Sequence, residues 1–148
     1  MRFKIAAAAM VLTWAVSVGQ VARGAQAPGA STTWSGIYTE EQAKSGGAAY
    51  AKHCSECHLE DLAGDGFAPA LKGPEFMNNW NSLSLGDLFE RIRVSMPPSD
   101  PNAVTPKEKV DIITYVLKSA GFPAGTTELP SQPEALKAIK FEATKPGH

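Results

Sequence analysis

The residues of this sequence best suited to chemistry lie in one short run, Cys54-Ser55-Glu56-Cys57-His58. The two cysteines are the only ones among 148 residues, and a histidine follows the second directly. Two thiols one helical turn apart can add to the two vinyl groups of a porphyrin, and the imidazole of the next residue can then ligate the iron. The motif therefore predicts one covalently bound haem c, attached through Cys54 and Cys57 and ligated by His58.

Three other uses of a closely spaced cysteine pair fit the sequence less well. A redox-active C-x-x-C pair expects a βαβ setting, and no strand alternation is visible in the sequence. A tetrahedral zinc site needs four ligands, and His53 and His58 flank the cysteines too closely for the usual finger spacing. A plain disulfide is natural in an exported protein but does not explain the histidine that follows.

A helix is expected to lead into this motif. The segment Thr39-Glu40-Glu41-Gln42 has the form of a capping box, in which the Gln42 side chain would reach back to the N-cap. The helix should run to about Cys54, because Ala43, Gly47, Tyr50 and Cys54 recur on one helical face.

Two further helices carry clear start signals. Ser84 with Asp87 predicts one, and Thr105-Pro106-Lys107-Glu108 predicts another that ends at Gly121 and Pro123. The span from Leu59 to Asn81 reads as a long irregular loop, and the Pro-rich tail from residue 122 has one or two helical turns near residues 134–139. The sequence thus predicts an all-α fold of about three main helices joined by long loops.

The N-terminus has the pattern of a secretory signal peptide. Arg2 and Lys4 precede an apolar run, residues 5–18, that is short for a membrane span, and small residues follow where a signal peptidase could cut. We expect residues 1–24 to be a signal peptide, 25–37 a flexible leader, 38–123 the folded domain and 124–148 a C-terminal extension. An uncleaved signal would instead anchor the protein to the membrane.

Composition excludes several classes of protein. With 43% hydrophobic and 20% charged residues the sequence is neither disordered nor a multi-pass membrane protein. Residues 1–24 contain three basic residues and no acid, so the remainder has 11 basic and 15 acidic residues and a net charge of −4. That charge does not favour nucleic acid as a partner.

Residues 46–58 resemble the haem-binding helix of class I bacterial cytochromes c. Gly46 stands eight residues before the first cysteine and Tyr50 four before it, as in that family. The segment Ala68-Pro69-Ala70-Leu71-Lys72-Gly73 is similar to the family's loop on the histidine side of the haem. The resemblance covers about residues 39–121 and implies a small cytochrome c fold with long loops wrapped around one haem.

The resemblance also implies specific contacts. The carbonyl of Pro69 would accept a hydrogen bond from the ligand histidine, and the first and last helices would cross near Gly46 or Gly47 and Tyr115. Leu59 is a departure, because the family often has glycine there, so the conformation of the loop at that point is open.

The sixth iron ligand is expected to be Met96. Methionine sulfur is a common partner of histidine in electron-transfer cytochromes. Apart from the start codon and the signal, only Met77 and Met96 are available. Met96 lies on a Ser-Met-Pro-Pro turn shortly before the last predicted helix, the place of the ligand in the family, whereas Met77 lies only 19 residues past His58. Trp80 could bond a haem propionate or simply pack in the core.

These features predict a periplasmic electron-transfer protein and not an enzyme. Its partners would be redox proteins that donate and accept electrons, such as a periplasmic dehydrogenase or a terminal oxidase. Two alternatives stay open. The tail at residues 122–130 resembles those of cytochromes associated with quinoprotein dehydrogenases, which suggests a haem subunit of such a complex. A displaceable sixth ligand would instead indicate a haem enzyme or sensor.

Overall fold

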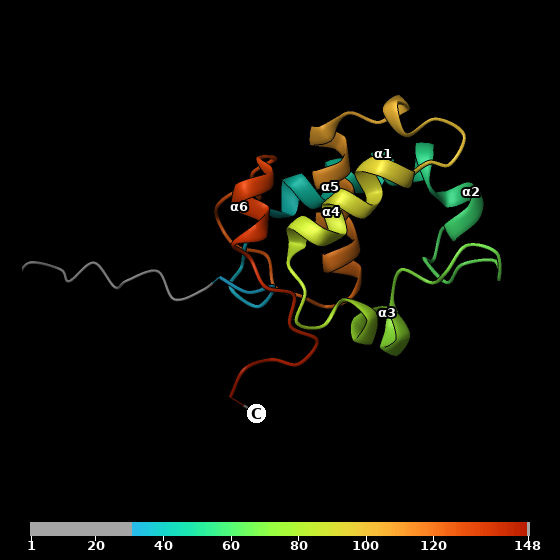
Figure 1. Ribbon diagram of the computed structural model, residues 1–148. Coiled ribbons are helices and arrows are strands. Elements are labelled where there is room, and N and C mark those ends of the chain that lie inside the picture. Colours follow the sequence, from blue (N-terminus) through green and yellow to red (C-terminus); the bar gives the residue numbers. More distant parts are fainter. Residues whose placement is uncertain (1–30, 148) are drawn as a thin grey trace, which may run out of the picture.

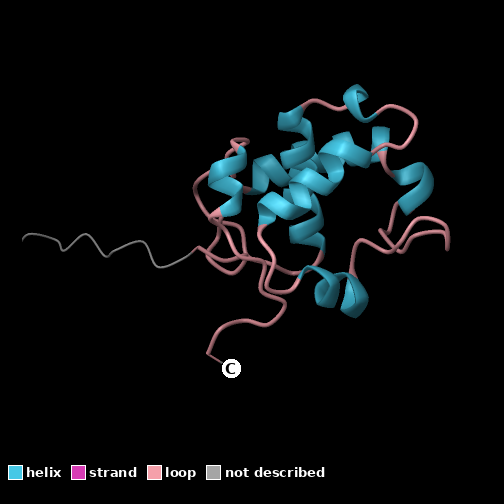
Figure 2. Ribbon diagram, viewed as in Figure 1, coloured by secondary structure: helices cyan, strands magenta, loops and turns pink. Residues whose placement is uncertain are grey.

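The chain folds into α-helices joined by long loops, as seen in a computed structural model that describes residues 31–147 (Figures 1 and 2). The expected signal peptide, residues 1–24, lies outside the described residues. Within them there are six α-helices, one 3-10 helix and no strand, which confirms the all-α fold. The helices are α1 Glu40–His53, α2 Ser55–His58, α3 Gly73–Trp80, α4 Leu85–Ser95, η1 Pro101–Ala103, α5 Pro106–Ser119 and α6 Pro133–Lys137.

Helices α1 and α5 cross at the centre of the fold, at the place that the resemblance implies. A Cβ atom on Gly46 would overlap the backbone carbonyl of Asp111, so only glycine permits this approach of the two backbones. A Cβ on Gly47 would lie 3.2 Å from the ring of Tyr115, which in turn packs against Tyr50 with 5.2 Å between ring centroids. The crossing therefore fixes the path of α1, the helix that leads into the cysteines.

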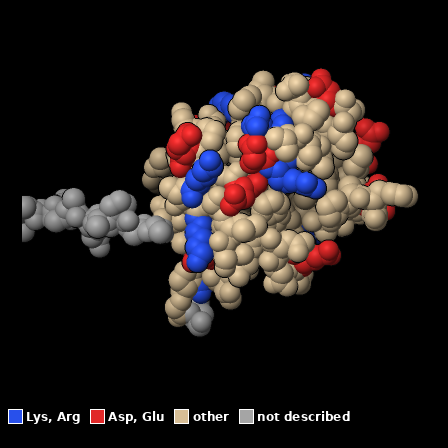
Figure 3. All heavy atoms as spheres, in the orientation of Figure 1, with Lys and Arg blue, Asp and Glu red and all other residues tan. Residues whose placement is uncertain are grey.

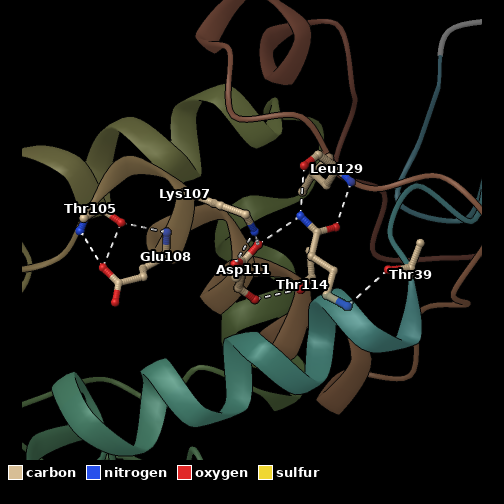
Figure 4. Close-up of polar contacts among 8 residues, drawn as sticks. Thr39, Thr105, Lys107, Glu108, Asp111, Thr114 and Leu129 are labelled. Atoms are coloured by element: carbon tan, nitrogen blue, oxygen red, sulfur yellow. Dashed lines mark hydrogen bonds and ion pairs between the residues drawn. The ribbon is translucent and has the colours of Figure 1, made fainter.

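The start of α1 differs from the expected capping box. Thr39 Oγ1 accepts a hydrogen bond from the backbone N–H of Gln42, as predicted. The Gln42 side chain, however, is buried, and its hydrogen-bond partners are Asp111 and Leu129, both labelled in Figure 4, rather than the N-cap. It donates to Asp111 Oδ1 at 3.1 Å and exchanges hydrogen bonds with the backbone of Leu129. Gln42 thus joins α1 to α5 and to the C-terminal segment, and the prediction that it reaches back is wrong because these buried partners compete better.

The other two helix starts are confirmed. Ser84 and Asp87 form a reciprocal capping box at α4, and Thr105 and Glu108 form one at α5. These boxes satisfy N–H groups that the first helical turn leaves without partners. Helix α5 ends before Gly121, whose φ of +88° suits glycine.

Helix α3 was not expected, because Gly73 and Pro74 read as loop residues within the span from Leu59 to Asn81. The structure places Pro74 in the first turn of α3, where a missing N–H costs nothing. The helix buries Phe76, which contacts Trp80 and Phe141. The expected long loop is therefore shorter and ends where α3 begins.

The C-terminal segment packs closely against the helical domain. Leu129, Leu136 and Phe141 are buried, and α6 is the helical stretch expected near residues 134–139. The segment also contacts residues 31–37, the described part of the expected leader, since Trp34 Nε1 donates to the carbonyl of Glu142 at 2.9 Å.

The surface carries charges of both signs. On the face seen in Figure 3, acidic and basic side chains are interspersed, without a large field of one sign. Among residues 31–147, none of the helices has the length and apolar character needed to cross a membrane.

The helix crossing can be tested with a matched pair of glycine substitutions. Gly46→Ala should lower the free energy of unfolding by about 1–3 kcal/mol, because the new methyl group overlaps the Asp111 carbonyl. Gly47→Ala should be close to neutral, because it meets a side chain that can shift and because alanine favours the helix by about 1 kcal/mol. Denaturant unfolding of both variants measures the difference, and equal stability would contradict the proposed backbone contact.

Candidate functional site

The cysteine motif lies where one helix ends and the next begins. Cys54 is both the C-cap of α1 and the N-cap of α2, with φ −127° and ψ −30°. Its N–H donates to Tyr50 O at 2.8 Å, and its carbonyl accepts from His58 N at 2.9 Å. The single turn of α2 therefore carries Cys57 and His58 on backbone that is tied to the end of α1. In Figure 1, α2, the following loop and α3 form an arc on one side of α4 and α5.

The two cysteines are free thiols in different environments. Cys54 is half-buried and Cys57 is exposed. Burial raises the pKa of the Cys54 thiol to about 11, so at neutral pH it is protonated. A redox-active cysteine pair needs a thiol whose pKa is lowered, because the thiolate is the nucleophile. Cys54 is thus poorly suited to be the attacking thiol of a thiol–disulfide exchange.

The histidine is held in one defined orientation. His58 is buried, and its Nδ1 lies 2.8 Å from the carbonyl oxygen of Pro69, the contact that the resemblance implies. A carbonyl can only accept, so Nδ1 donates its proton to Pro69, which leaves Nε2 as the ring atom that can ligate a metal. A hydrogen bond of this kind fixes the tautomer of a metal-ligating histidine and raises its basicity.

The loop that supplies Pro69 is held by two aspartates. Asp65 Oδ1 accepts from the N–H groups of Phe67 and Ala68 at 2.9 and 2.8 Å, and Asp61 Oδ1 accepts from Ala63 N at 3.0 Å. These backbone hydrogen bonds lower the pKa of both carboxyl groups. The loop is therefore built from Asx turns, which bring the Pro69 carbonyl back to the histidine.

The loop is also tied to the histidine through its backbone. Gly64 N donates to His58 O at 3.0 Å, and Leu71 N donates to Leu62 O at 2.9 Å. Of the residues that shape the loop, the Asp65-Gly66 pair is an ordinary turn signal in the sequence, whereas nothing in the pattern singles out Asp61.

Leu59, the departure from the family pattern, adopts a conformation that suits glycine. Its φ of +61° and ψ of 159° fall in a region that is otherwise almost exclusive to glycine. The Tyr50 hydroxyl donates to the Leu59 carbonyl at 2.7 Å, and burial raises the pKa of Tyr50, which keeps this donor protonated. The loop thus makes with leucine a turn whose backbone conformation suits glycine, at the cost of backbone strain.

The two candidate methionines have different surroundings. Met77 lies on α3 and packs against the hydrophobic core, as does Trp80 from the same helix. Met96 is the half-buried C-cap of α4, and it is not among the described side chains that pack against the core. Core packing therefore accounts for Met77 and for Trp80 but leaves Met96 without an assigned role.

Met96 lies on the loop between α4 and α5. The first turn of α5 is close to the end of α1. The charges of His53 and Lys52 contribute to a lowered pKa for Glu108, whose largest cause is its hydrogen bond to Thr105. The beginning of α5 therefore lies within electrostatic range of the residues directly before Cys54.

The residues present fit a covalently held haem. Two free thiols one turn apart precede a buried imidazole whose Nδ1 is bound to the Pro69 carbonyl, and a thioether is available on the loop before α5. Zinc fits less well, because among residues 31–147 no group of three or more His, Cys, Asp or Glu side chains is placed to hold a metal ion.

Comparison with known proteins gives one match. Residues 41–116 match the family described as cytochrome C oxidase, cbb3-type, subunit III. This stretch is just over half of the chain and runs from the first turn of α1 into α5, so that it contains the cysteine motif, the Pro69 loop and Met96. No curated protein and no solved structure matches the chain.

The strain at Leu59 can be measured directly. Leu59→Gly should raise the free energy of unfolding by about 1 kcal/mol, because it removes the cost of a conformation that disfavours a side chain. Leu59→Ala is the control, since it keeps Cβ and hence the strain while it shortens a side chain that is 39% exposed. Thermal unfolding of both variants gives the comparison, and a loss of stability in Leu59→Gly would show that the turn is not strained.

Proposed function

This chain belongs to the c-type cytochrome family, and from that membership we propose that it is an exported, periplasmic electron carrier with one haem c. Electron transfer through haem iron is the activity of the family. The number of haems, the residues that hold the iron and the export of the chain are our proposals. The observation that carries the proposed iron site is the 2.8 Å contact between His58 Nδ1 and Pro69 O, which prepares Nε2 to bind a metal. The single C-x-x-C-H motif supports one haem, and the signal-peptide pattern of residues 1–24 supports export.

In this proposal Cys54 and Cys57 hold the haem by thioether bonds, and His58 and Met96 ligate the iron. A bound haem c supplies an iron that gains or loses a single electron. The chain supplies a buried and oriented imidazole and a loop held by Asx turns. Because these groups are fixed by hydrogen bonds, little of the protein has to reorganise when the charge of the iron changes.

We assign the sixth position to Met96 rather than Met77. Met77 and its helix are accounted for by packing against the core. Met96 lies in the connection to α5, whose first turn is within electrostatic range of the residues next to Cys54. A thioether ligand from Met96 together with the imidazole of His58 would also raise the reduction potential of the iron.

A sixth ligand from the protein favours a carrier over an enzyme or a sensor. If His58 and Met96 both ligate the iron, no position would remain there for a substrate or a gas. Electron transfer then needs only a partner that approaches the haem edge.

The partner is proposed to be a redox protein. The matched family is described as a subunit of an oxidase, which supports a terminal oxidase as an electron acceptor. The resemblance of residues 122–130 to tails of cytochromes associated with quinoprotein dehydrogenases supports a periplasmic dehydrogenase as a donor. Within the chain this segment contacts its own domain, since Leu129 is buried and bonds Gln42.

Export and covalent attachment can be tested in one experiment. Mass spectrometry of the exported protein should show the loss of about residues 1–24 and the added mass of one haem, and acid–acetone extraction should leave the haem on the polypeptide. The Cys54→Ser/Cys57→Ser double variant is the control and should lack the added mass. Extractable haem would contradict covalent attachment, and an intact Met1 would indicate a membrane anchor.

The sixth ligand can be tested by comparing two alanine variants. The wild-type ferric protein should show the weak near-infrared charge-transfer band of methionine-ligated iron. Met96→Ala should abolish it, let the ferrous iron bind carbon monoxide, and lower the potential by on the order of tenths of a volt, within the ~0.8 V that axial ligands span. The measurements are optical spectra and a redox titration.

Met77→Ala is the matched control. It should keep the band and the potential and lose about 2 kcal/mol of stability, the low end for a Met→Ala change because the side chain is only half-buried. Loss of the band in Met77→Ala but not in Met96→Ala would overturn the assignment. Absence of the band from the wild type, with ready binding of carbon monoxide, would favour the enzyme or sensor.

A further inference from the structure

A buried lysine lies directly beside the loop that carries Met96. Lys109, in the first turns of α5, is only 3% exposed, although lysine is among the residues least often buried. Its Nζ donates to two backbone carbonyls, Pro101 O at 2.6 Å and Arg93 O at 3.2 Å. The lysine thus contacts the end of α4 and the turn η1 at the same time.

These two carbonyls bracket Met96. Arg93 precedes it by three residues on the last turn of α4, and Pro101 follows it by five residues at the start of η1. In Figure 1 the chain leaves α4, passes through η1 and returns to the beginning of α5. The ammonium group of Lys109 therefore links the two ends of the loop that contains Met96.

The carbonyl of Arg93 has a particular need for such a donor. In a continuing helix it would accept from the residue four positions later, but that residue is Pro97, which has no N–H. The Lys109 ammonium supplies the hydrogen bond that the proline cannot.

Burial of this charge is costly. Desolvation lowers the pKa of Lys109, the charge of Arg93 acts in the same direction, and Asp100 opposes both. An uncharged side chain of similar size would fill the space without this cost, so the contribution of the ammonium lies in the two carbonyls it joins.

We propose that Lys109 is a positioning residue that holds the Met96 loop so that the methionine sulfur stays at the iron. The inference rests on the proposed function, because it assumes that Met96 is the sixth ligand. Without the two hydrogen bonds from Lys109 the Met96 loop would open more often, and an external ligand would then compete with the methionine for the iron.

The test compares three variants of the haem-bearing protein. Lys109→Met keeps an unbranched side chain, shorter by one atom, but has no donor. Lys109→Arg keeps donors that can reach both carbonyls. Lys107→Met removes the same charge two residues away, where the lysine is paired with Asp111 and does not contact the loop.

Lys109→Met should bind carbon monoxide in the ferrous state at least about tenfold faster than the wild type, because it loses two charge-assisted hydrogen bonds and tenfold is the low end of the ratio expected for one. It should also weaken the near-infrared band, while its unfolding midpoint changes little. Lys109→Arg and Lys107→Met should bind carbon monoxide as the wild type does and keep the band.

The possible outcomes separate this inference from the proposed function. A wild type without the band would refute methionine ligation itself. A wild type with the band, together with a Lys109→Met variant that has the same band and the same carbon monoxide kinetics, would refute the role of Lys109 alone. If Lys109→Met does not fold, Lys109→Gln takes its place, because its side chain is too short to bridge both carbonyls. The near-infrared band and the carbon monoxide kinetics of that variant then test the role of Lys109.

Discussion

The close crossing of α1 and α5 is the constraint on which the rest of the structure depends. Gly46 lets the backbone of α1 lie directly against that of α5 at Asp111. One end of α1 becomes the cysteine motif, and the first turns of α5 carry Lys109, which holds the Met96 loop. Two segments that lie far apart in sequence are thereby brought to the same end of the helix pair, as the effect of His53 on Glu108 indicates.

Hydrogen bonds from side chains to backbone carbonyls, rather than pairs of charged side chains, shape the proposed site. His58 bonds to the Pro69 carbonyl, Tyr50 to the Leu59 carbonyl, and Lys109 to the carbonyls that flank Met96. Each of these contacts fixes the path of the backbone next to a proposed ligand. A site held in this way suits a reaction in which the iron changes its charge while its surroundings stay in place.

The sequence predicted the helices with strong start signals and the histidine with its partner. Thr105 with Glu108 and Ser84 with Asp87 act locally, so their capping boxes could be recognised without the fold. The contact from His58 to Pro69 could be expected only through the resemblance, because it depends on how the loop between them folds.

The features that were missed depend on tertiary contacts. Gln42 has the spacing of a capping residue, but Leu129 and Asp111 compete for its amide. Helix α3 begins at a Gly-Pro pair that by itself indicates a loop, and Phe76 stabilises it by packing on Phe141, far away in the sequence. Lys109 lies in a charged first turn that predicts a solvated side chain, and only the path of the Met96 loop buries it.

X-ray absorption at the iron edge tests the central claim most directly, because it identifies the element of each atom that binds the iron without any substitution. If His58 and Met96 hold the iron, the purified protein should show one sulfur ligand in addition to the nitrogens of the porphyrin and of the histidine. The sulfur should be present in the ferric and the ferrous states, since an electron carrier keeps its ligands. A spectrum without a sulfur ligand in either state, or one in which the sulfur is lost on reduction, would contradict methionine ligation and the carrier function that depends on it.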